Sequence, residues 1–293
     1  MRLLVTGSNG QIARALHALG QPGLDVVSLG RPELDVTEPT SVAAAIRRHQ
    51  PDVVVNAAAT TAVDKAEGEE DAAFAVNATG AGHVAAAAAA QDRPVIHIST
   101  DYVFPGDKPT PYLETDPTGP QSAYGRSKLA GEIAVAAANP RHVILRTAWV
   151  YAPYGANFLR TMLRLAGSQP ALRVVADQLG TPTYALDIAD GILVVARRLC
   201  EDAAPSGVFH MVAAGETTWA GFAEEIFRQS AALGGPSARV LPIATIDYPR
   251  PARRPANSRL DTTRFRATFE HALPPWQDGV RRCLAALNTD RAS

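Results

Sequence analysis

The sequence contains very little cysteine and no long apolar run. Its 293 residues include only two cysteines, Cys200 and Cys283, which lie far apart and lack the spacing of metal ligands. No apolar stretch is long enough to cross a bilayer. The chain begins with the strand-like MRLLVTG, which reads as a folded segment and not as a signal peptide. We therefore expect a cytoplasmic protein without a cysteine metal site.

A charge excess of either sign is also missing. Twenty-eight Lys and Arg residues face 29 Asp and Glu residues, for a formal net charge of −1. This balance favours neither nucleic acid nor a membrane surface as a partner. Lysine is scarce, because every basic residue except Lys65, Lys108 and Lys128 is arginine. Composition bias accounts for most of this, but arginine cannot release its proton, so each lysine is of interest.

Runs rich in Val and Ile alternate with helical patterns through the first half of the chain. We predict strands at 2–7, 24–30, 52–59, 94–100 and 142–150, and helices at 10–19, 39–49, 70–91 and 123–138. Such alternation is typical of a parallel sheet with right-handed helical crossovers. The prediction is an α/β fold with a Rossmann-like, doubly wound parallel sheet.

The alternation loosens after about residue 150. We predict helices at 156–167, 184–199, 219–233 and 275–287, strands at 172–177 and 207–213, and a Pro- and Arg-rich loop at 248–262. Residues 1–152 are expected to form an NAD(P)-binding Rossmann domain, to which 184–213 returns. The remainder, within 153–293, is expected to form a smaller C-terminal substrate-binding lobe.

The stretch VTGSNGQIA at 5–13 reads as a strand, a glycine turn and a helix start. Gly7 permits the turn, and Gly10 lets the backbone approach a pyrophosphate at the positive end of the helix dipole. Ala13 stands where a small residue must pack against the sheet. Because the motif opens a long α/β pattern, it indicates dinucleotide binding; a plain glycine-rich turn is the alternative.

The end of the second predicted strand bears on the choice of cofactor. NAD-binding folds place an acidic residue there to hold the ribose 2′-hydroxyl, whereas an arginine suits the 2′-phosphate of NADP. The sequence reads SLGRPELD, with Arg31 near this position and Asp35 further along. We expect NADPH as cofactor, with NADH possible and Asp35 near the adenine.

A tyrosine and a lysine lie one helical turn apart in SAYGRSKLAG, at Tyr124 and Lys128. Thr100 ends the strand at 94–100, and parallel α/β sheets bind ligands at the carboxyl ends of their strands. A nearby ammonium lowers the pKa of a phenol. The three side chains could therefore protonate a carbonyl oxygen as hydride arrives at its carbon. The alternative is an exposed tyrosine beside a solvated lysine.

The chain resembles the extended short-chain dehydrogenase/reductases, and within them the dTDP-4-dehydrorhamnose reductase family. The matching segments include TGSNGQ, TAVDKAE, STDYVFPG, YGRSKLAGE, RTAWVYAPYGANF, DQLGTPT and NSRLDT. The resemblance implies reduction of the 4-keto group of dTDP-4-dehydro-β-L-rhamnose by NAD(P)H. It implies that Tyr124 donates the proton, that Lys128 tunes it and holds the nicotinamide ribose, and that Thr100 orients the keto oxygen.

Further site residues follow from the same resemblance. Those implied at the cofactor are Gly7, Asn9, Gly10, Gln11 and Ile12 at the pyrophosphate, Asp35 and Val36 at the adenine, and Ala58, Ala59 and Thr61 along its length. Those implied at the sugar or the pocket wall are Asp101, Trp149, Gln178 and Thr183. Lys65 could contact the ligand or simply be solvated.

The loop at 248–262 carries Arg250, Arg253, Arg254 and Arg259. Arginine binds phosphate oxygens in pairs, and a nucleotide-sugar diphosphate carries two charges. We expect Arg254 and Arg259 in particular to contact a small-molecule nucleotide sugar. A solvated loop is the alternative.

One feature of some family members is missing. They dimerise through magnesium held by three glutamates, and the matching positions here are Ala15, Leu186 and Gln277. None supplies a carboxylate, and magnesium prefers hard oxygen ligands. We expect no bound metal, and either a monomer or a dimer not bridged by magnesium.

Three other functions are alternatives. A nucleotide-sugar dehydratase or epimerase is disfavoured, because dehydratases resemble one another in an Asp-Glu pair after the threonine, and here Tyr102 follows Asp101. Another dTDP-deoxysugar 4-ketoreductase remains an alternative. So does a non-catalytic subunit resembling the methionine adenosyltransferase β-subunit, although the complete set of Thr100, Tyr124 and Lys128 favours an enzyme.

Overall fold

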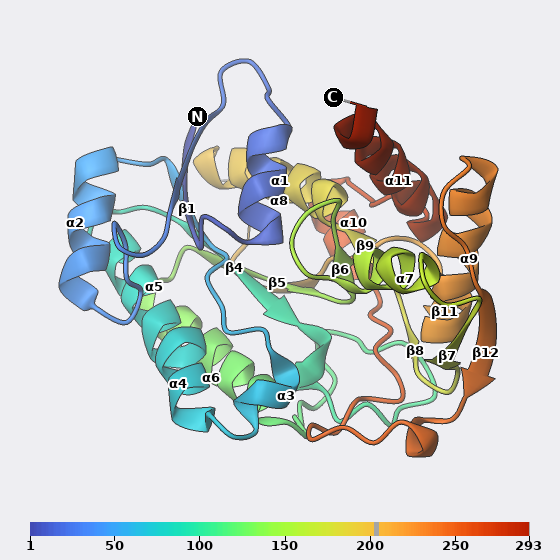
Figure 1. The fold of residues 1–293 in the computed structure, drawn as a ribbon. Coiled ribbons are helices and arrows are strands. Elements are labelled where there is room, and N and C mark those ends of the chain that lie inside the picture. The colour runs from blue at the N-terminus through green and yellow to red at the C-terminus, as the bar shows by residue number, and fades with distance from the viewer. Residues whose placement is uncertain (202–204, 293) are drawn as a thin grey trace.

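A six-stranded parallel sheet forms the centre of the computed structural model, which describes residues 1–201 and 205–292 (Figure 1). The strand order is β10-β5-β4-β3-β1-β2. The strands are β1 (Arg2–Thr6), β2 (Asp25–Leu29), β3 (Val53–Asn56), β4 (Val95–Thr100), β5 (His142–Thr147) and β10 (Gly207–His210). The order reverses direction between β1 and β3, as the predicted doubly wound fold requires, so that prediction is confirmed.

Helices cover both faces of this sheet. One face packs against α2 (Pro39–His49), α5 (Ala81–Ala89) and α6 (Ala123–Ala138), and the other against α1 (Gln11–Ala18), α8 (Ala185–Cys200) and α10 (Thr263–Phe269). Alternate strand residues serve the two faces: Val95 packs toward α5 and α6, while Ile96 packs toward α1 and α8. His97 and Ser99 therefore share the α6 face of β4.

The turn between β1 and α1 depends on Gly7. Its φ is +83°, which favours glycine, and a Cβ there would lie 3.0 Å from Ala58 Cα. The turn and the loop after β3 can therefore touch only because Gly7 has no side chain. This close approach places the start of α1 where the strand order of the sheet reverses, between β1 and β3.

A smaller group of elements packs around a second core in the C-terminal half (Figure 1). It comprises α7 (Phe158–Ala166), β7 (Ala171–Val175), α9 (Trp219–Ala232), β12 (Arg239–Ile243) and α11 (Trp276–Ala292), with short strands β6 (Val150–Tyr151), β8 (Leu179–Gly180), β9 (Thr183–Tyr184) and β11 (Thr217–Thr218). Strand β10 pairs with β5 in the main sheet. The predicted domain boundaries stay a prediction.

Four local features differ from the sequence-based expectation. The helix expected at 70–91 consists of α4 (Glu70–Phe74), a π-helical segment η1 (Ala75–Gly80) and α5. The strand expected at 142–150 is divided, because Trp149 has a φ of +49°. Helix α10 and strand β12 were not predicted.

Across the described ranges, none of the helices combines the length and the apolar character needed to cross a membrane.

Candidate active site

Thr100 and Tyr124 meet at the carboxyl end of β4. Thr100 is the last residue of that strand, and Tyr124 lies in the first turn of α6. Ser122 caps the helix by accepting a hydrogen bond from the Gly125 amide at 3.1 Å. A Cβ on Gly125 would lie 2.3 Å from the Tyr102 carbonyl oxygen, so the helix start is pressed against η2 (Asp101–Val103). Packing and capping together fix where Tyr124 points.

The Tyr124 side chain is 9% exposed. Burial raises the pKa of Tyr124 above its ordinary value, and the nearby Thr100 hydroxyl opposes this rise. The group therefore carries its proton at neutral pH. A protonated phenol beside a hydroxyl donor suits a role as proton donor to a ligand oxygen.

Lys128 contacts β4 through its ammonium, and the expected tuning of the phenol by this lysine stays a prediction. Its ammonium donates to the Ile98 carbonyl at 2.7 Å and lies 3.3 Å from His97 Nε2. Burial lowers the pKa of Lys128 to about 8, while the Glu132 carboxylate opposes the change. Sequence reasoning missed His97 because only the folded sheet brings it beneath α6.

Asp101 follows Thr100 and is 3% exposed. Its Oδ1 accepts from the Thr100 hydroxyl at 3.0 Å, while its Oδ2 has no hydrogen-bond partner among the described residues. Burial raises the pKa of this carboxyl to about 6, and the Ser258 and Thr100 hydroxyls oppose the rise. A buried, unpaired oxygen next to Thr100 fits the expected contact with a sugar hydroxyl.

The predicted pyrophosphate residues surround the β1–α1 turn. The N-cap of α1 is Gly10, which offers no side chain, so the first amides of the helix have no side-chain cap. Asn9 is exposed, Ile12 is buried in the core, and Gln11 Oε1 accepts from Asn157 at 3.1 Å. An open cradle of backbone amides at a helix N-terminus fits a dinucleotide pyrophosphate.

Arg31 and Asp35 form an ion pair beyond the end of β2. Arg31 Nε lies 2.7 Å from Asp35 Oδ2, and the Arg31 side chain is 66% exposed. Hydrogen bonds from Arg31 and Thr37 lower the pKa of Asp35 to about 2. Val36, which follows, is buried against Gly80. The exposed guanidinium is free on one side to meet a ribose phosphate.

The loop after β3 carries the other predicted cofactor residues. Ala58 and Ala59 are half-buried and Thr61 is exposed. The Ala58 amide donates to Thr6 Oγ1 at 3.1 Å, which ties this loop to the end of β1. The loop therefore lies beside the glycine turn.

The basic loop reaches the site through Arg254. Its guanidinium donates to the Tyr102 hydroxyl and to Asp64 Oδ2, each at 3.0 Å, and Arg250 lies 3.8 Å from the same carboxylate. Tyr102 in turn packs edge-on against Tyr124, with ring centroids 5.5 Å apart. Arg254 is thus one aromatic ring away from the phenol. Asp64 and Tyr102 were not singled out from the sequence.

Two other basic residues have contacts elsewhere. Arg259 donates to Glu216 at 3.0 Å and to Asn257 Oδ1 at 2.8 Å, and only 13% of its side chain is exposed. These contacts do not support the prediction that it binds substrate. Lys65 pairs with Glu69 at 3.2 Å on the surface.

Trp149 lies flat on Trp219, with ring centroids 3.6 Å apart. Trp219 also donates to Gln178 Oε1 at 3.2 Å, and Gln178 donates to Thr245 at 3.0 Å. Sequence reasoning selected Trp149 and Gln178 but missed Trp219, which lies 70 residues from its stacking partner.

Thr183 is fully buried, and its hydroxyl donates to the Thr181 carbonyl at 3.1 Å. It also accepts from the Ala213 amide at 3.4 Å. A direct substrate contact by Thr183 is therefore not supported.

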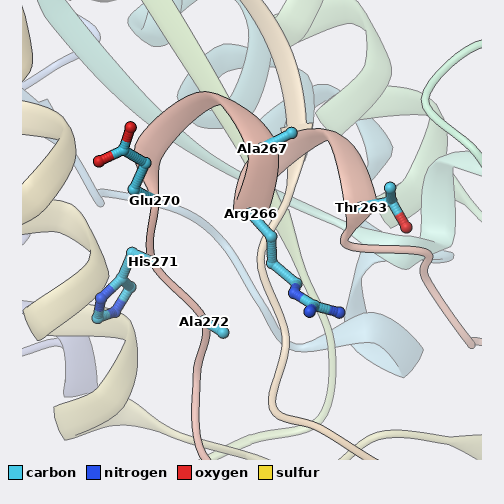
Figure 2. Close-up of a pocket in the computed structure, with 6 residues that line it drawn as sticks. All are labelled: Thr263, Arg266, Ala267, Glu270, His271 and Ala272. Atoms are coloured by element: carbon cyan, nitrogen blue, oxygen red, sulfur yellow. The ribbon is translucent and has the colours of Figure 1, made fainter.

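A surface hollow of about 500 Å³ lies along α10, away from these residues (Figure 2). In Figure 2, Glu270 and His271 lie on one side of the lining residues, Thr263 lies on the other side, and Arg266 lies between them. Because α10 packs on α8, the hollow is on the sheet face opposite α6. It does not belong to the site around Tyr124.

The positions matching the magnesium glutamates are occupied as follows. Ala15 is fully buried in α1, Leu186 packs against the core from α8, and Gln277 is exposed. Within the described part of the chain, no three His, Cys, Asp or Glu side chains gather closely enough to hold a metal ion.

Comparison with known proteins gives full-length matches. A family model described as the RmlD substrate binding domain matches residues 1–289. The chain is 52% identical to a dTDP-4-dehydrorhamnose reductase of Sinorhizobium fredii, over 98% of each chain. It is 44% identical to a probable dTDP-4,6-dihydroxy-2-methyloxan-3-one 4-ketoreductase of Streptomyces antibioticus, over 96% of this chain and 94% of that one. A solved dTDP-4-dehydrorhamnose reductase of Bacillus anthracis in complex with NADP matches with a TM-score of 0.91 and 34% identity, over 97% and 99% of the two chains.

Proposed function

The chain belongs to the dTDP-4-dehydrorhamnose reductase family, and on this basis we propose that it reduces dTDP-4-dehydro-β-L-rhamnose to dTDP-L-rhamnose with NAD(P)H. The observation that carries the proposal is the buried Thr100–Tyr124 pair at the carboxyl end of β4. In a chain so similar to reductases, this pair supplies the proton that ketone reduction requires.

The two hydroxyl groups divide the work at the 4-keto oxygen. Thr100 would turn its hydroxyl hydrogen from Asp101 Oδ1 to this oxygen and so orient it, and Tyr124 donates a proton to the oxygen as it gains negative charge. Since burial raises the pKa of Tyr124, the phenol holds its proton until a stronger base, the developing alkoxide, is beside it. Asp101 is placed to accept a hydrogen bond from a neighbouring sugar hydroxyl.

When bound, the nicotinamide supplies the hydride that reduces the carbonyl carbon. The first backbone amides of α1, at Gln11 and Ile12, would hold the pyrophosphate, and Lys128 has one N–H left for the ribose beyond its two present contacts. The exposed Arg31 supports a preference for NADPH over NADH. The NADP-bound relative from Bacillus anthracis agrees with that preference.

Purified protein supplied with NADPH and dTDP-4-dehydrorhamnose tests the proposal. We expect oxidation of NADPH, followed by absorbance, and formation of dTDP-L-rhamnose, identified by its proton couplings. No oxidation with this substrate would reject the proposed substrate.

The relative from Streptomyces antibioticus supports a second candidate, reduction of a different dTDP-deoxysugar 4-ketone. Thr100 and Tyr124 of this chain would act in the same way on that substrate, because they would contact only its keto oxygen. Competition between the two keto sugars separates the candidates: the proposed function predicts a higher kcat/KM for dTDP-4-dehydrorhamnose.

A further inference from the structure

Three polar side chains form a row across the centre of the sheet. Thr6 on β1 is directly opposite Asn56 on β3, and Asn56 is directly opposite His97 on β4. None of the three is more than 1% exposed. A parallel sheet covered on both faces is normally filled by apolar residues, and buried polar groups are costly unless they are hydrogen-bonded. Three buried polar side chains at the centre of this sheet therefore need interactions that offset the cost of their burial.

Continuous short contacts connect this row with Lys128. Thr6 Oγ1 lies 2.7 Å from Asn56 Oδ1, Asn56 Nδ2 lies 3.0 Å from His97 Nδ1, and His97 Nε2 lies 3.3 Å from Lys128 Nζ. At the other end, the Ala58 amide donates to Thr6. The row thus joins the loop after β3 to the buried lysine of α6.

We propose that His97 is a positioning residue for Lys128: its Nε2 accepts a hydrogen bond from the ammonium and, together with the Ile98 carbonyl, holds it at the carboxyl end of β4. Asn56 and Thr6 fix the plane of the ring. Two of the three N–H groups of Lys128 are then occupied, and the third is left for a ligand. The proposal deepens the proposed function, on which it rests for the role of Lys128.

The charges around the lysine agree with this arrangement. Burial and the neighbouring Lys128 charge lower the pKa of His97 well below its usual range, so the ring is neutral and one nitrogen can accept. From α6, Glu132 favours the charged form of Lys128, and that carboxylate is paired with Arg146 of β5 at 2.6 Å. Tyr124, one turn earlier on α6, is neutral. A neutral acceptor at Nε2 thus stabilises the charged form of Lys128. It adds to the effect of Glu132, whose carboxylate is shared with Arg146.

The proposal fixes the tautomer of the ring. If Nε2 accepts from Lys128, the hydrogen of the neutral imidazole is on Nδ1 and must meet an acceptor on Asn56. A half-turn of the Asn56 amide brings Oδ1 to His97 and Nδ2 to Thr6, whose hydroxyl can donate or accept. The structure places Nδ2 toward the ring and Oδ1 toward Thr6, and that orientation of the amide would put the imidazole hydrogen on Nε2, pointing at the ammonium. The charged lysine therefore requires the Nδ1–H tautomer.

Two substitutions at His97 separate positioning from packing. The side-chain amide of a Gln at position 97 would reach the place of the imidazole Nε2. The shorter side chain of Asn would reach only the place of Nδ1. His97→Asn should lower kcat about tenfold, as expected for a lost hydrogen bond to a charged group, and should move the basic limb of the kcat–pH profile to lower pH. His97→Gln should keep kcat within about threefold and leave the limb in place, since an acceptor remains.

His142→Asn, at the opposite end of a strand from the site, serves as the matched control and should leave both kcat and the pH profile unchanged. A His97→Asn profile that coincides with the wild type would overturn the proposal. Equal losses in His97→Gln and His97→Asn would overturn it too, because they would indicate packing alone.

A measurement on the unaltered protein covers the case in which the variants fail to fold. Nitrogen-15 NMR of the imidazoles at pH 7, with the His97 signals identified by comparison with His97→Gln or, if needed, by through-bond assignment, should show a protonated Nδ1 and an unprotonated Nε2. A protonated Nε2 would contradict the proposal. Because this readout needs no turnover, it also separates the failure of this contact from the failure of the proposed function.

Discussion

At the scale of single residues, the proton-donor chemistry of Tyr124 depends more on the burial of its phenol than on its spacing from Lys128. The four-residue interval was enough to predict that the two side chains share a helix. It could not show that Lys128 points to His97 and Ile98, because those partners come from β4, about 30 residues away. The same limit explains why Trp219 and Asp64 were missed: their partners are distant in sequence.

Replacing Tyr124 with Phe removes the proton donor and leaves the ring in place. We expect kcat to fall by about 10² or more, with cofactor affinity unchanged. Steady-state kinetics and NADPH fluorescence titration measure the two quantities. Tyr184→Phe, in the C-terminal core, is the matched control. Wild-type turnover in Tyr124→Phe would reject its assigned role.

Arg31→Ala tests the predicted preference for NADPH. The substitution removes a cation and leaves the Asp35 carboxylate unpaired, so the 2′-phosphate would lose an attraction and meet a repulsion. We expect kcat/KM for NADPH to fall about tenfold relative to that for NADH, as for the loss of one charge-assisted hydrogen bond. Arg47→Ala, on α2, is the control. A ratio equal to the wild-type ratio counts against Arg31 as the determinant.

At the scale of elements, runs rich in Val and Ile predicted the strands of the main sheet, because buried parallel strands are nearly continuous apolar segments. The sequence pattern could not predict the π-helical turn η1. Asn77 in that turn accepts from the Thr60 amide at 2.8 Å and donates to Ser127 at 2.9 Å, which are contacts with other elements. Strand β12 was missed because its pattern, with Pro242 and partial exposure, lacks the alternation of a half-buried strand.

The junction between η2 and α6 is the element contact on which the site depends most. Gly125→Ala would place a Cβ 2.3 Å from the Tyr102 carbonyl oxygen and push the helix start away from β4. We expect a loss of about 1–3 kcal/mol in the free energy of unfolding, together with a lower kcat. Denaturant unfolding and kinetics measure both.

Gly68→Ala is the matched control for this substitution, because the nearest atom to its added Cβ would be the Lys65 carbonyl oxygen at 3.9 Å. Equal stability of the Gly125 and Gly68 variants would show that the tight contact at the start of α6 is not needed.

At the scale of the whole molecule, the assembly prediction rests on three positions without carboxylates, Ala15, Leu186 and Gln277. Dialysis against EDTA should leave reductase activity and the sedimentation coefficient unchanged, because these positions offer magnesium no carboxylate. Stoichiometric magnesium in the purified protein, with loss of activity on its removal, would contradict this prediction.

The central claim is that hydride reaches the carbonyl carbon at C4 of the sugar while Tyr124 protonates its oxygen. The most direct measurement uses NADPH deuterated at the transferable position, with dTDP-4-dehydrorhamnose as substrate and NMR of the product. We predict dTDP-L-rhamnose with deuterium at C4 and at no other carbon. A product without deuterium at C4, or unreacted keto sugar, would contradict the account.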